Sequence, residues 1–383
     1  MGQDFILEKA TILAFFIALV LALFLFTVKS KRHNKVSNML MGLFLLILAI
    51  HISVFLYSDY IRTPLIFEQL RDQFMLFSGP LLYLYLISSM YLDFKLNKGH
   101  LLHIIPFVLV IIIFIPRFFS VSETDRMVFY QSYHSHLEAK LYAFLNMVTI
   151  SFYLILMCVE LKKYKLILLE NYSDKRYFNY KWLNQLTFLL VLLFIFSFFR
   201  TAIIYFGNHE EILNIRIFHT IYLVLFVSWL ILKSLYSPEI FRAVDTKHKL
   251  VKNLYLNNSQ NINLNQVSDQ KEIQEKIVKL RQHIEINQSF LNSTLSIKEL
   301  ANSVGMETQE LSILINRYIG KHFFDFINEY RIEMAIKILE DPNRRSSHVL
   351  EILYEVGFNS KSSFHRAFRK YTRKTPKDYR AKS

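Results

Sequence analysis

The sequence predicts an all-α protein in two parts, a bundle of seven transmembrane helices followed by a polar domain that is also helical. The first observation is compositional: 53% of the 383 residues are hydrophobic, yet the formal net charge is +14. Such a balance requires that apolar and basic residues be segregated along the chain. The second observation is this segregation itself, because runs of Leu, Ile, Phe and Val end near Tyr236 and the chain beyond Pro238 is polar and charged.

Seven apolar stretches are long enough to cross a membrane. A helix needs about 20 apolar residues to span a hydrocarbon core of about 30 Å. In the fourth stretch the purely apolar part ends at Ile115, so Arg117 would have to extend toward the membrane surface. We therefore expect residues 1–236 to form a seven-helix transmembrane domain that contacts the lipid bilayer. The stretches are approximately residues 10–28, 39–57, 74–92, 101–119, 141–161, 186–206 and 217–235.

Basic residues in the connecting loops predict the orientation, because Lys and Arg concentrate on the cytoplasmic side. Seven crossings then place the N-terminus outside and the chain after Leu235 in the cytoplasm of a bacterium, with the bundle in its inner membrane. The first stretch is expected to be an uncleaved anchor, because Asp4 and Glu8 precede it where a signal peptide is positively charged. The basic residues of the three inner loops are Lys29, Lys31, Arg32, Lys35, Lys95, Lys98, Lys162, Lys163, Lys165, Lys175, Arg176 and Lys181.

Four polar residues inside the predicted spans are candidates for binding a signal, which would be an unknown small molecule or a membrane component. A charged or polar group inside a bilayer is costly and is therefore a marker of function. The alternative is structural: Arg200 extends outward or pairs with a neighbouring helix, and the other three form hydrogen bonds between helices. The candidates are Arg200, His51, Asn146 and His219.

The sequence offers little for a metal, a cofactor or catalysis. His134 and His136 lie close together outside the spans, but no third ligand accompanies them. The single cysteine, Cys158, excludes an intrachain disulfide and a cysteine-based metal site. The chain has no Walker motif, no His-Glu-x-x-His pair, no nucleophile elbow and no dinucleotide-binding glycine pattern. We therefore expect no enzyme, no metal and no cofactor.

Residues 237–272 are expected to be a juxtamembrane linker, because Pro238 should end the seventh helix and residues 257–270 are rich in Asn, Gln and Ser. The helical domain that follows, residues 273–383, opens with an apolar stripe on one helix. The stripe can pack on its own domain or pair two subunits, and it is too short to predict a coiled coil. It consists of Ile273, Ile277, Leu280 and Ile284.

Two helix-turn-helix patterns follow, about 50 residues apart. Ser296 and Glu299 form a capping box at the start of the first pattern, and Gly305 permits its turn. The second pattern repeats the plan with its turn at Gly357. Between them, residues 323–339 predict one helix of about 25 Å. Two second helices joined in this way could enter successive major grooves about 34 Å apart on one face of a duplex.

Four segments of this region carry a family signature in its order and spacing: Asn328-Glu329-Tyr330-Arg331-Ile332, Glu355-Val356-Gly357-Phe358-Asn359-Ser360, Phe364-x-x-Ala367-Phe368-Arg369-Lys370-Tyr371 and Thr375-Pro376-x-x-Tyr379-Arg380. With them, residues 273–380 resemble the DNA-binding domain of the AraC/XylS family of transcription regulators. The chain departs from the family at Arg373, where glycine is usual, so its local turn is expected to differ. Arg331 is expected to hold the connecting helix to the second helix-turn-helix unit.

The resemblance implies a set of base-reading positions. Gln309 and Asn316 suit adenine edges, whereas Ile313 could contact only a thymine methyl, so the first unit is expected to read DNA weakly. The basic end of the chain, including Arg369 and Lys370, is expected to bind phosphates, and a solvated basic tail is the alternative. The implied base-reading positions are Gln309, Ser312, Ile313 and Asn316 in the first unit and Lys361, Ser362, His365 and Arg366 in the second.

These patterns favour a membrane-embedded, sequence-specific DNA-binding transcription regulator that couples an outer or intramembrane signal to gene expression. Its expected partners are double-stranded DNA, with RNA polymerase as a further candidate. A homodimer is expected from the habit of the family and the short apolar stripe. The alternative is a seven-helix membrane receptor or transporter whose C-terminal domain binds proteins, but Lys361 and Arg366 favour DNA.

Overall fold

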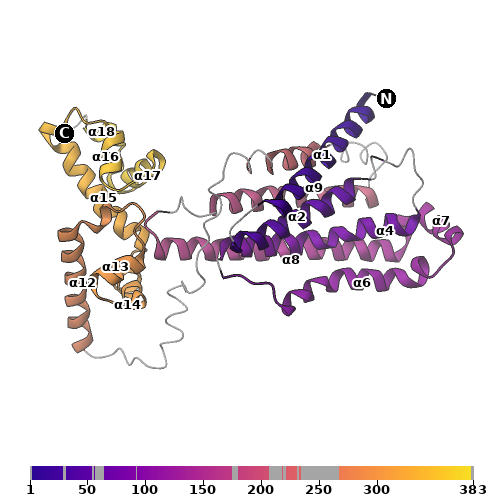
Figure 1. The fold of residues 1–383 in the computed structure, drawn as a ribbon, viewed down its shortest axis with the longest axis horizontal. Coiled ribbons are helices and arrows are strands. Elements are labelled where there is room, and N and C mark those ends of the chain that lie inside the picture. The colour runs from indigo at the N-terminus through magenta and orange to yellow at the C-terminus, as the bar shows by residue number, and fades with distance from the viewer. Residues whose placement is uncertain are drawn as a thin grey trace. The chain divides into compact units, whose positions relative to one another are not determined.

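The computed structural model describes residues 2–28, 32–53, 56, 64–91, 93–174, 180–206, 218, 221–230, 233 and 267–380. The chain forms two compact units (Figure 1). The first unit comprises Met1–Leu161 and Phe178–Asp245, and the second comprises Lys162–Tyr177 and Thr246–Ser383. Every regular element in the described residues is a helix, which confirms the all-α prediction for that part of the chain.

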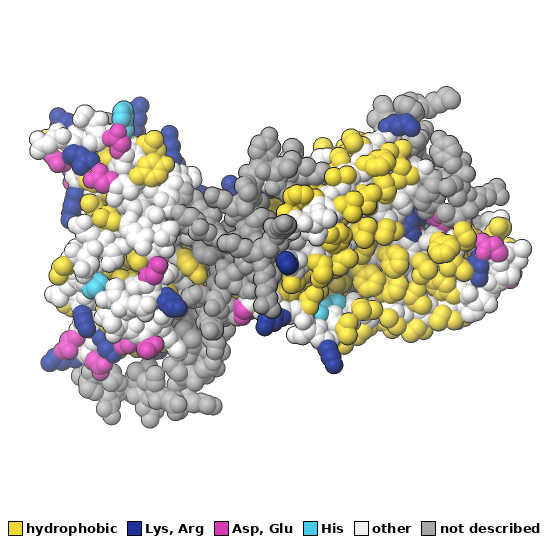
Figure 2. Space-filling view, in the orientation of Figure 1, with side chains coloured by type: hydrophobic (Ala, Val, Ile, Leu, Met, Phe, Trp, Pro, Cys, Tyr) yellow, Lys and Arg dark blue, Asp and Glu magenta, His cyan; other side chains and the backbone are white. Residues whose placement is uncertain are grey.

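The first unit is built from long apolar helices. Six helical stretches of the described residues are long and apolar enough to cross a membrane, and they match the first six predicted spans. Of the seventh, the structure describes the short apolar helix Ile221–Leu230. Figure 2 shows hydrophobic side chains gathered over this unit. Its main helices are α1 (Gly2–Thr27), α2 (Arg32–Ile52), α4 (Leu65–Gln73), α5 (Ser78–Met90), α6 (Ile105–Phe114), α7 (Glu123–Gln131), α8 (Leu137–Asn171, whose last ten residues belong to the second unit) and α9 (Tyr180–Phe206).

The second unit contains both helix-turn-helix patterns. Its first helix begins at Val267, six residues ahead of the predicted domain start at Ile273. A π-helical turn, Leu314–Tyr318, follows α14 directly. Charged side chains are scattered over this unit in Figure 2. The helices are α12 (Val267–Asn287), α13 (Ile297–Val304), α14 (Thr308–Ile313), α15 (Phe323–Glu340), α16 (Val349–Glu355), α17 (Lys361–Thr372) and α18 (Pro376–Arg380).

Helix α15 is shared by two hydrophobic cores. Its first half contributes Phe323 and Phe326 to a core with α12, α13 and α14. Its second half contributes Ile332 and Leu339 to a core with α16 and α17. One continuous helix of 18 residues therefore joins the two helix-turn-helix units, as the sequence predicted.

The apolar stripe of α12 is part of the first core. Ile277, Leu280 and Ile284 are all buried there, and Ile273 packs against them. Of the two uses that the sequence allowed, the structure shows packing within the domain. The stripe therefore gives no support to pairing of two subunits.

Local signals define the ends of these helices. Ser296 Oγ accepts a hydrogen bond from Glu299 N at 3.3 Å, and the Glu299 carboxylate accepts one from Ser296 N at 2.8 Å, which is the predicted capping box. Gly305 and Gly357 have φ of 73° and 88°, in the left-handed region that glycine adopts at no steric cost. Arg373 has φ of 58° at the C-terminal end of α17. The left-handed turn expected of a glycine is thus formed by an arginine.

Replacing Arg373 by glycine should stabilise the domain. A left-handed conformation costs a residue with a Cβ about 1–2 kcal/mol, and glycine avoids this cost. Glycine also loses more backbone entropy on folding, which offsets about 0.5–1 kcal/mol of the gain in stability. We expect Arg373→Gly to raise the free energy of unfolding of residues 267–383 by about 0.5–1 kcal/mol, measured by urea denaturation. Arg373→Ala is the matched control, because it removes the charge and keeps the Cβ. An equal gain in both variants would contradict the explanation.

Candidate functional site

Helix α17 carries a cationic face. The hydroxyl of Ser360 caps its start by accepting a hydrogen bond from Ser363 N at 3.2 Å. Phe364, Ala367 and Phe368 are buried in the second core and fix the rotation of the helix. The helix has four basic and no acidic residues. Its opposite face exposes five of the predicted DNA-binding residues, Lys361, Ser362, Arg366, Arg369 and Lys370, with His365 half-buried beside them.

One of these cationic side chains is paired within the domain, and the histidine is uncharged. Lys370 Nζ lies 2.7 Å from Asp325 Oδ1, so part of its charge is neutralised. Burial of the His365 ring, together with nearby Lys361, lowers the pKa of His365, so the ring is neutral at pH 7. Lys361 and Arg366 form no ion pair with any residue that the structure describes. They are therefore the strongest candidates for contacts to an anionic partner.

The corresponding surface of the first helix-turn-helix unit is weaker. Gln309 is exposed and Ile313 is partly exposed, but Ser312 is only 5% exposed. Asn316 Nδ2 donates to Ser312 O at 2.8 Å, where α14 passes into a π-helical turn. Ser312 is the one buried residue among the base-reading positions that the resemblance implies, and its contact with a base stays a prediction. Glu310 is the one acidic residue of α14 and pairs with Lys276 at 2.7 Å.

The two helix-turn-helix units meet around Arg331, a buried residue of α15. Its guanidinium donates to the carbonyl oxygens of Phe290 and Asn292, both at 2.7 Å, and lies 5.6 Å from the ring centroid of Phe358. Burial lowers the pKa of Arg331 to about 10, so the side chain stays cationic at neutral pH. A Cβ on Gly357 would lie 2.7 Å from Phe290 O, so no larger residue fits there. The sequence placed Arg331 against the second unit alone, but its hydrogen bonds go to the loop of the first.

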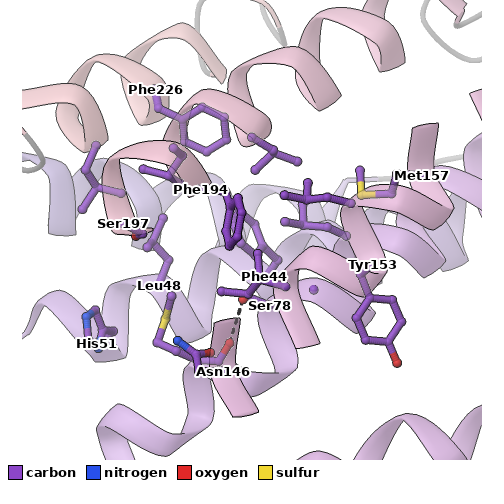
Figure 3. A pocket seen from close by; sticks show the side chains of 18 of the residues that line it. Phe44, Leu48, His51, Ser78, Asn146, Tyr153, Met157, Phe194, Ser197 and Phe226 are labelled. Atoms are coloured by element: carbon purple, nitrogen blue, oxygen red, sulfur yellow. Dashed lines mark hydrogen bonds between the residues drawn. The ribbon is translucent and has the colours of Figure 1, made fainter. Parts of the chain in front are cut away.

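A separate cavity of about 150 Å³ lies in the first unit (Figure 3). Its walls are mostly aliphatic and aromatic. Three of the four predicted signal-binding residues line it: His51 from α2, Asn146 from α8 and Arg200 from α9. His51 Nδ1 also lies 3.5 Å from Asp72 Oδ1. The fourth candidate, His219, lies outside the described residues.

The sequence interpretation missed other polar residues of the cavity wall. Ser78, Tyr142 and Ser197 line it too. Ser78 precedes Gly79, whose Cβ would lie 2.9 Å from Tyr153 Cδ2, so α5 and α8 approach closely at this point. A small residue beside a glycine in an apolar span is a sequence signal that could have directed attention to Ser78.

His134 and His136, which precede α8, contact other side chains of the protein. The His136 ring stacks on Phe129 with centroids 4.3 Å apart, and His136 Nε2 lies 3.0 Å from Ser132 Oγ. Among the described residues there is no group of three or more His, Cys, Asp or Glu side chains that could hold a metal ion.

Comparison with known proteins finds similarity for the C-terminal part of the chain. Residues 300–382 match the family described as "Helix-turn-helix domain". This part of the chain is a helix-turn-helix domain. Over 106 residues the chain is 33% identical to an uncharacterized HTH-type transcriptional regulator of Staphylococcus aureus (strain COL), a match covering 28% of this chain and 13% of that protein. It is 28% identical over 86 residues to the uncharacterized HTH-type transcriptional regulator YdeC of Bacillus subtilis (strain 168), covering 22% of this chain and 28% of YdeC.

The similarity to these relatives is confined to part of each protein. The chain spans 13% of the length of the S. aureus relative and 28% of the length of the B. subtilis relative. No solved structure matches the chain.

Proposed function

We propose that the protein is a membrane-embedded transcription regulator of the AraC/XylS type. The observation that carries the proposal is the face of α17, which presents Lys361, Arg366 and Arg369 on the second helix of a helix-turn-helix unit. This is the position from which such units read base edges in the major groove. The names of the matched relatives support the same function.

In this proposal the two helix-turn-helix units contribute unequally to DNA recognition. Arg366 and Lys361 suit guanine, whereas Gln309 and Asn316 suit adenine and Asn316 already donates within its own helix. Helix α15 spans about 27 Å at 1.5 Å per residue and joins the two units. The second unit therefore anchors the domain, and the first adds a weaker contact in a neighbouring groove.

Selection of genomic duplexes with the full chain in nanodiscs should enrich a motif spanning two adjacent major grooves. Arg366→Ala should weaken binding to that motif about 10-fold or more, because it removes a bidentate contact to guanine. Lys279→Ala is the matched control, since it removes one exposed positive charge from α12 and should change binding about twofold at most. Binding without an enriched motif, or no binding at low salt, would favour the alternative of a membrane receptor or transporter with a protein-binding domain.

The remaining elements of the proposal concern the membrane. Six helical stretches of suitable length and the distribution of Lys and Arg support insertion in a bacterial inner membrane with the N-terminus outside and the helix-turn-helix domain in the cytoplasm. RNA polymerase is a further proposed partner. Homodimer formation remains an expectation from the family alone, because the α12 stripe is buried within the domain.

Cysteine labelling should reveal this orientation. In a Cys158→Ser background, Ser135→Cys should react with a membrane-impermeant maleimide in intact cells, because the predicted topology places this exposed loop outside. Lys95→Cys, also exposed, should react only after the cells are permeabilised, because its loop is predicted to face the cytoplasm. The opposite pattern of labelling would show that the orientation is wrong.

We further propose that the cavity of the first unit receives the signal. It combines an apolar wall with polar groups from four helices, an arrangement typical of sites for small molecules. A ligand bound there would change the packing of the helices only if its affinity differs between two states of the bundle.

Filling the cavity should make the regulator insensitive to its signal. Expression of a reporter gene placed under the selected operator would be measured in growth conditions that change this expression in cells with the wild-type protein. We expect Asn146→Phe to hold the output at one level, because the larger side chain occupies the space of the ligand. Phe144→Leu is the control, since Phe144 is on the same helix but 65% exposed. An unchanged response in Asn146→Phe and in Arg200→Gln would remove the cavity from the proposal.

A further inference from the structure

Helix α8 is longer than a membrane crossing requires. Its 35 residues extend about 52 Å, against a hydrocarbon core of about 30 Å. Lys162, Lys163 and Lys165 mark the predicted cytoplasmic surface, and the helix continues to Asn171. From Lys162 onward, the contacts of this segment place it in the second unit, with the helix-turn-helix domain.

The three residues after α8 form a docking segment, Tyr172 to Asp174, that pairs with the start of the first helix-turn-helix unit. Ser173 N donates to Leu295 O at 3.1 Å, and Ser173 Oγ donates to the same oxygen at 2.8 Å. An antiparallel bridge joins Tyr172 to Ser296, the N-cap of α13. Ser173 is only 1% exposed, so this contact is part of the interior of the domain.

Ser173 also completes the hydrogen bonding of Arg331. A guanidinium has five N–H donors, and a buried charge is tolerated only when its donors are matched. The helix-turn-helix domain supplies three acceptors, and Ser173 supplies the other two. The five acceptors are Phe290 O at 2.7 Å from Nε, Asn328 Oδ1 at 3.1 Å and Ser173 O at 3.4 Å from Nη1, and Asn292 O at 2.7 Å and Ser173 Oγ at 3.2 Å from Nη2.

The other end of the docking segment contacts the second unit. Asp174 Oδ2 accepts a hydrogen bond from Asn359 Nδ2 at 3.3 Å. Asn359 immediately precedes Ser360, the N-cap of α17. The segment therefore contacts both helix-turn-helix units, at the N-cap of α13 in the first and at the residue before the N-cap of α17 in the second.

We propose that the docking segment is the element through which α8 controls the helix-turn-helix domain. With Ser173 in place, all five donors of Arg331 are matched and the two units are held in one mutual arrangement, which pre-organises them for two adjacent grooves. Withdrawal of the segment leaves two donors of a buried cation unmatched and releases this arrangement. The inference rests on the proposed function, because it names the route by which a signal in the first unit reaches DNA.

The first test measures DNA affinity of the full chain in nanodiscs. Ser173→Trp cannot fit a site with 1% exposure and should expel the docking segment. We expect it to weaken binding to the two-groove operator at least about fivefold, while binding to a duplex carrying only the half-site of the second unit stays unchanged. Leu166→Trp, at a 41% exposed position near the end of α8, is the matched control.

Each other outcome overturns the inference. Equal affinity of Ser173→Trp and wild type for the operator would mean that the segment does not position the two units. Tighter binding would mean that the segment blocks DNA. Weaker binding to both duplexes would mean general damage to the domain. Failure of the wild-type chain to bind the selected operator would instead contradict the proposed function.

A crosslink tests docking without DNA. Residues paired across an antiparallel bridge have Cα atoms about 4.5–5.5 Å apart, which suits a disulfide. Tyr172→Cys with Ser296→Cys, in a Cys158→Ser background, should form an intrachain disulfide on mild oxidation, and the oxidised protein should keep the operator affinity of its reduced form or exceed it. Absence of the disulfide would show that the segment is not docked.

Discussion

The arrangement of the DNA-binding part depends on one buried cation. Arg331 lies at the middle of α15, between the two hydrophobic cores that this helix serves. A guanidinium away from water is stable only when every donor has an acceptor, so the residues that supply acceptors are fixed in position by this requirement. The loop at Phe290 and Asn292 and the segment after α8 are held together for this reason. Phe290 O, one of these acceptors, is also the atom that Gly357 approaches closely.

This organisation separates two tasks. Hydrophobic burial forms each helix-turn-helix core, and α15 links them covalently and by packing. Polar contacts around Arg331 then determine how the two cores are arranged. Burial is nondirectional, whereas hydrogen bonds to a planar guanidinium are directional. A change confined to the polar contacts can therefore alter the arrangement of the units without unfolding either one.

Features encoded over short distances could be predicted from the sequence. The capping box of Ser296, the turn at Gly305 and the continuous helix α15 follow from residues within a few positions of each other. The apolar runs predicted seven spans, and six of these correspond to helical stretches of sufficient length in the described residues. The burial of Ser312 could not be predicted, because it depends on how α14 packs against the rest of the domain. The contact between Ser173 and Arg331 joins residues 158 positions apart and leaves no local pattern.

The cavity of the first unit shows an intermediate case. His51, Asn146 and Arg200 were predicted as candidates for one signal site because each is polar in an apolar span, and the structure places all three on the wall of one cavity. The sequence did not specify how the three helices that carry them pack together. Their grouping is a property of helix packing.

Three of the five acceptors around Arg331 are main-chain carbonyls, those of Phe290, Asn292 and Ser173. Every residue type has a main-chain carbonyl. Substitutions in these three segments therefore keep the hydrogen bonds to Arg331, provided that the backbone conformation does not change. The contacts to the domain therefore fix few of the residue types in a segment that docks beside it. During evolution, an input module of unrelated ancestry could be joined to this domain if it delivered an extended stretch with a small hydroxyl residue at the right register.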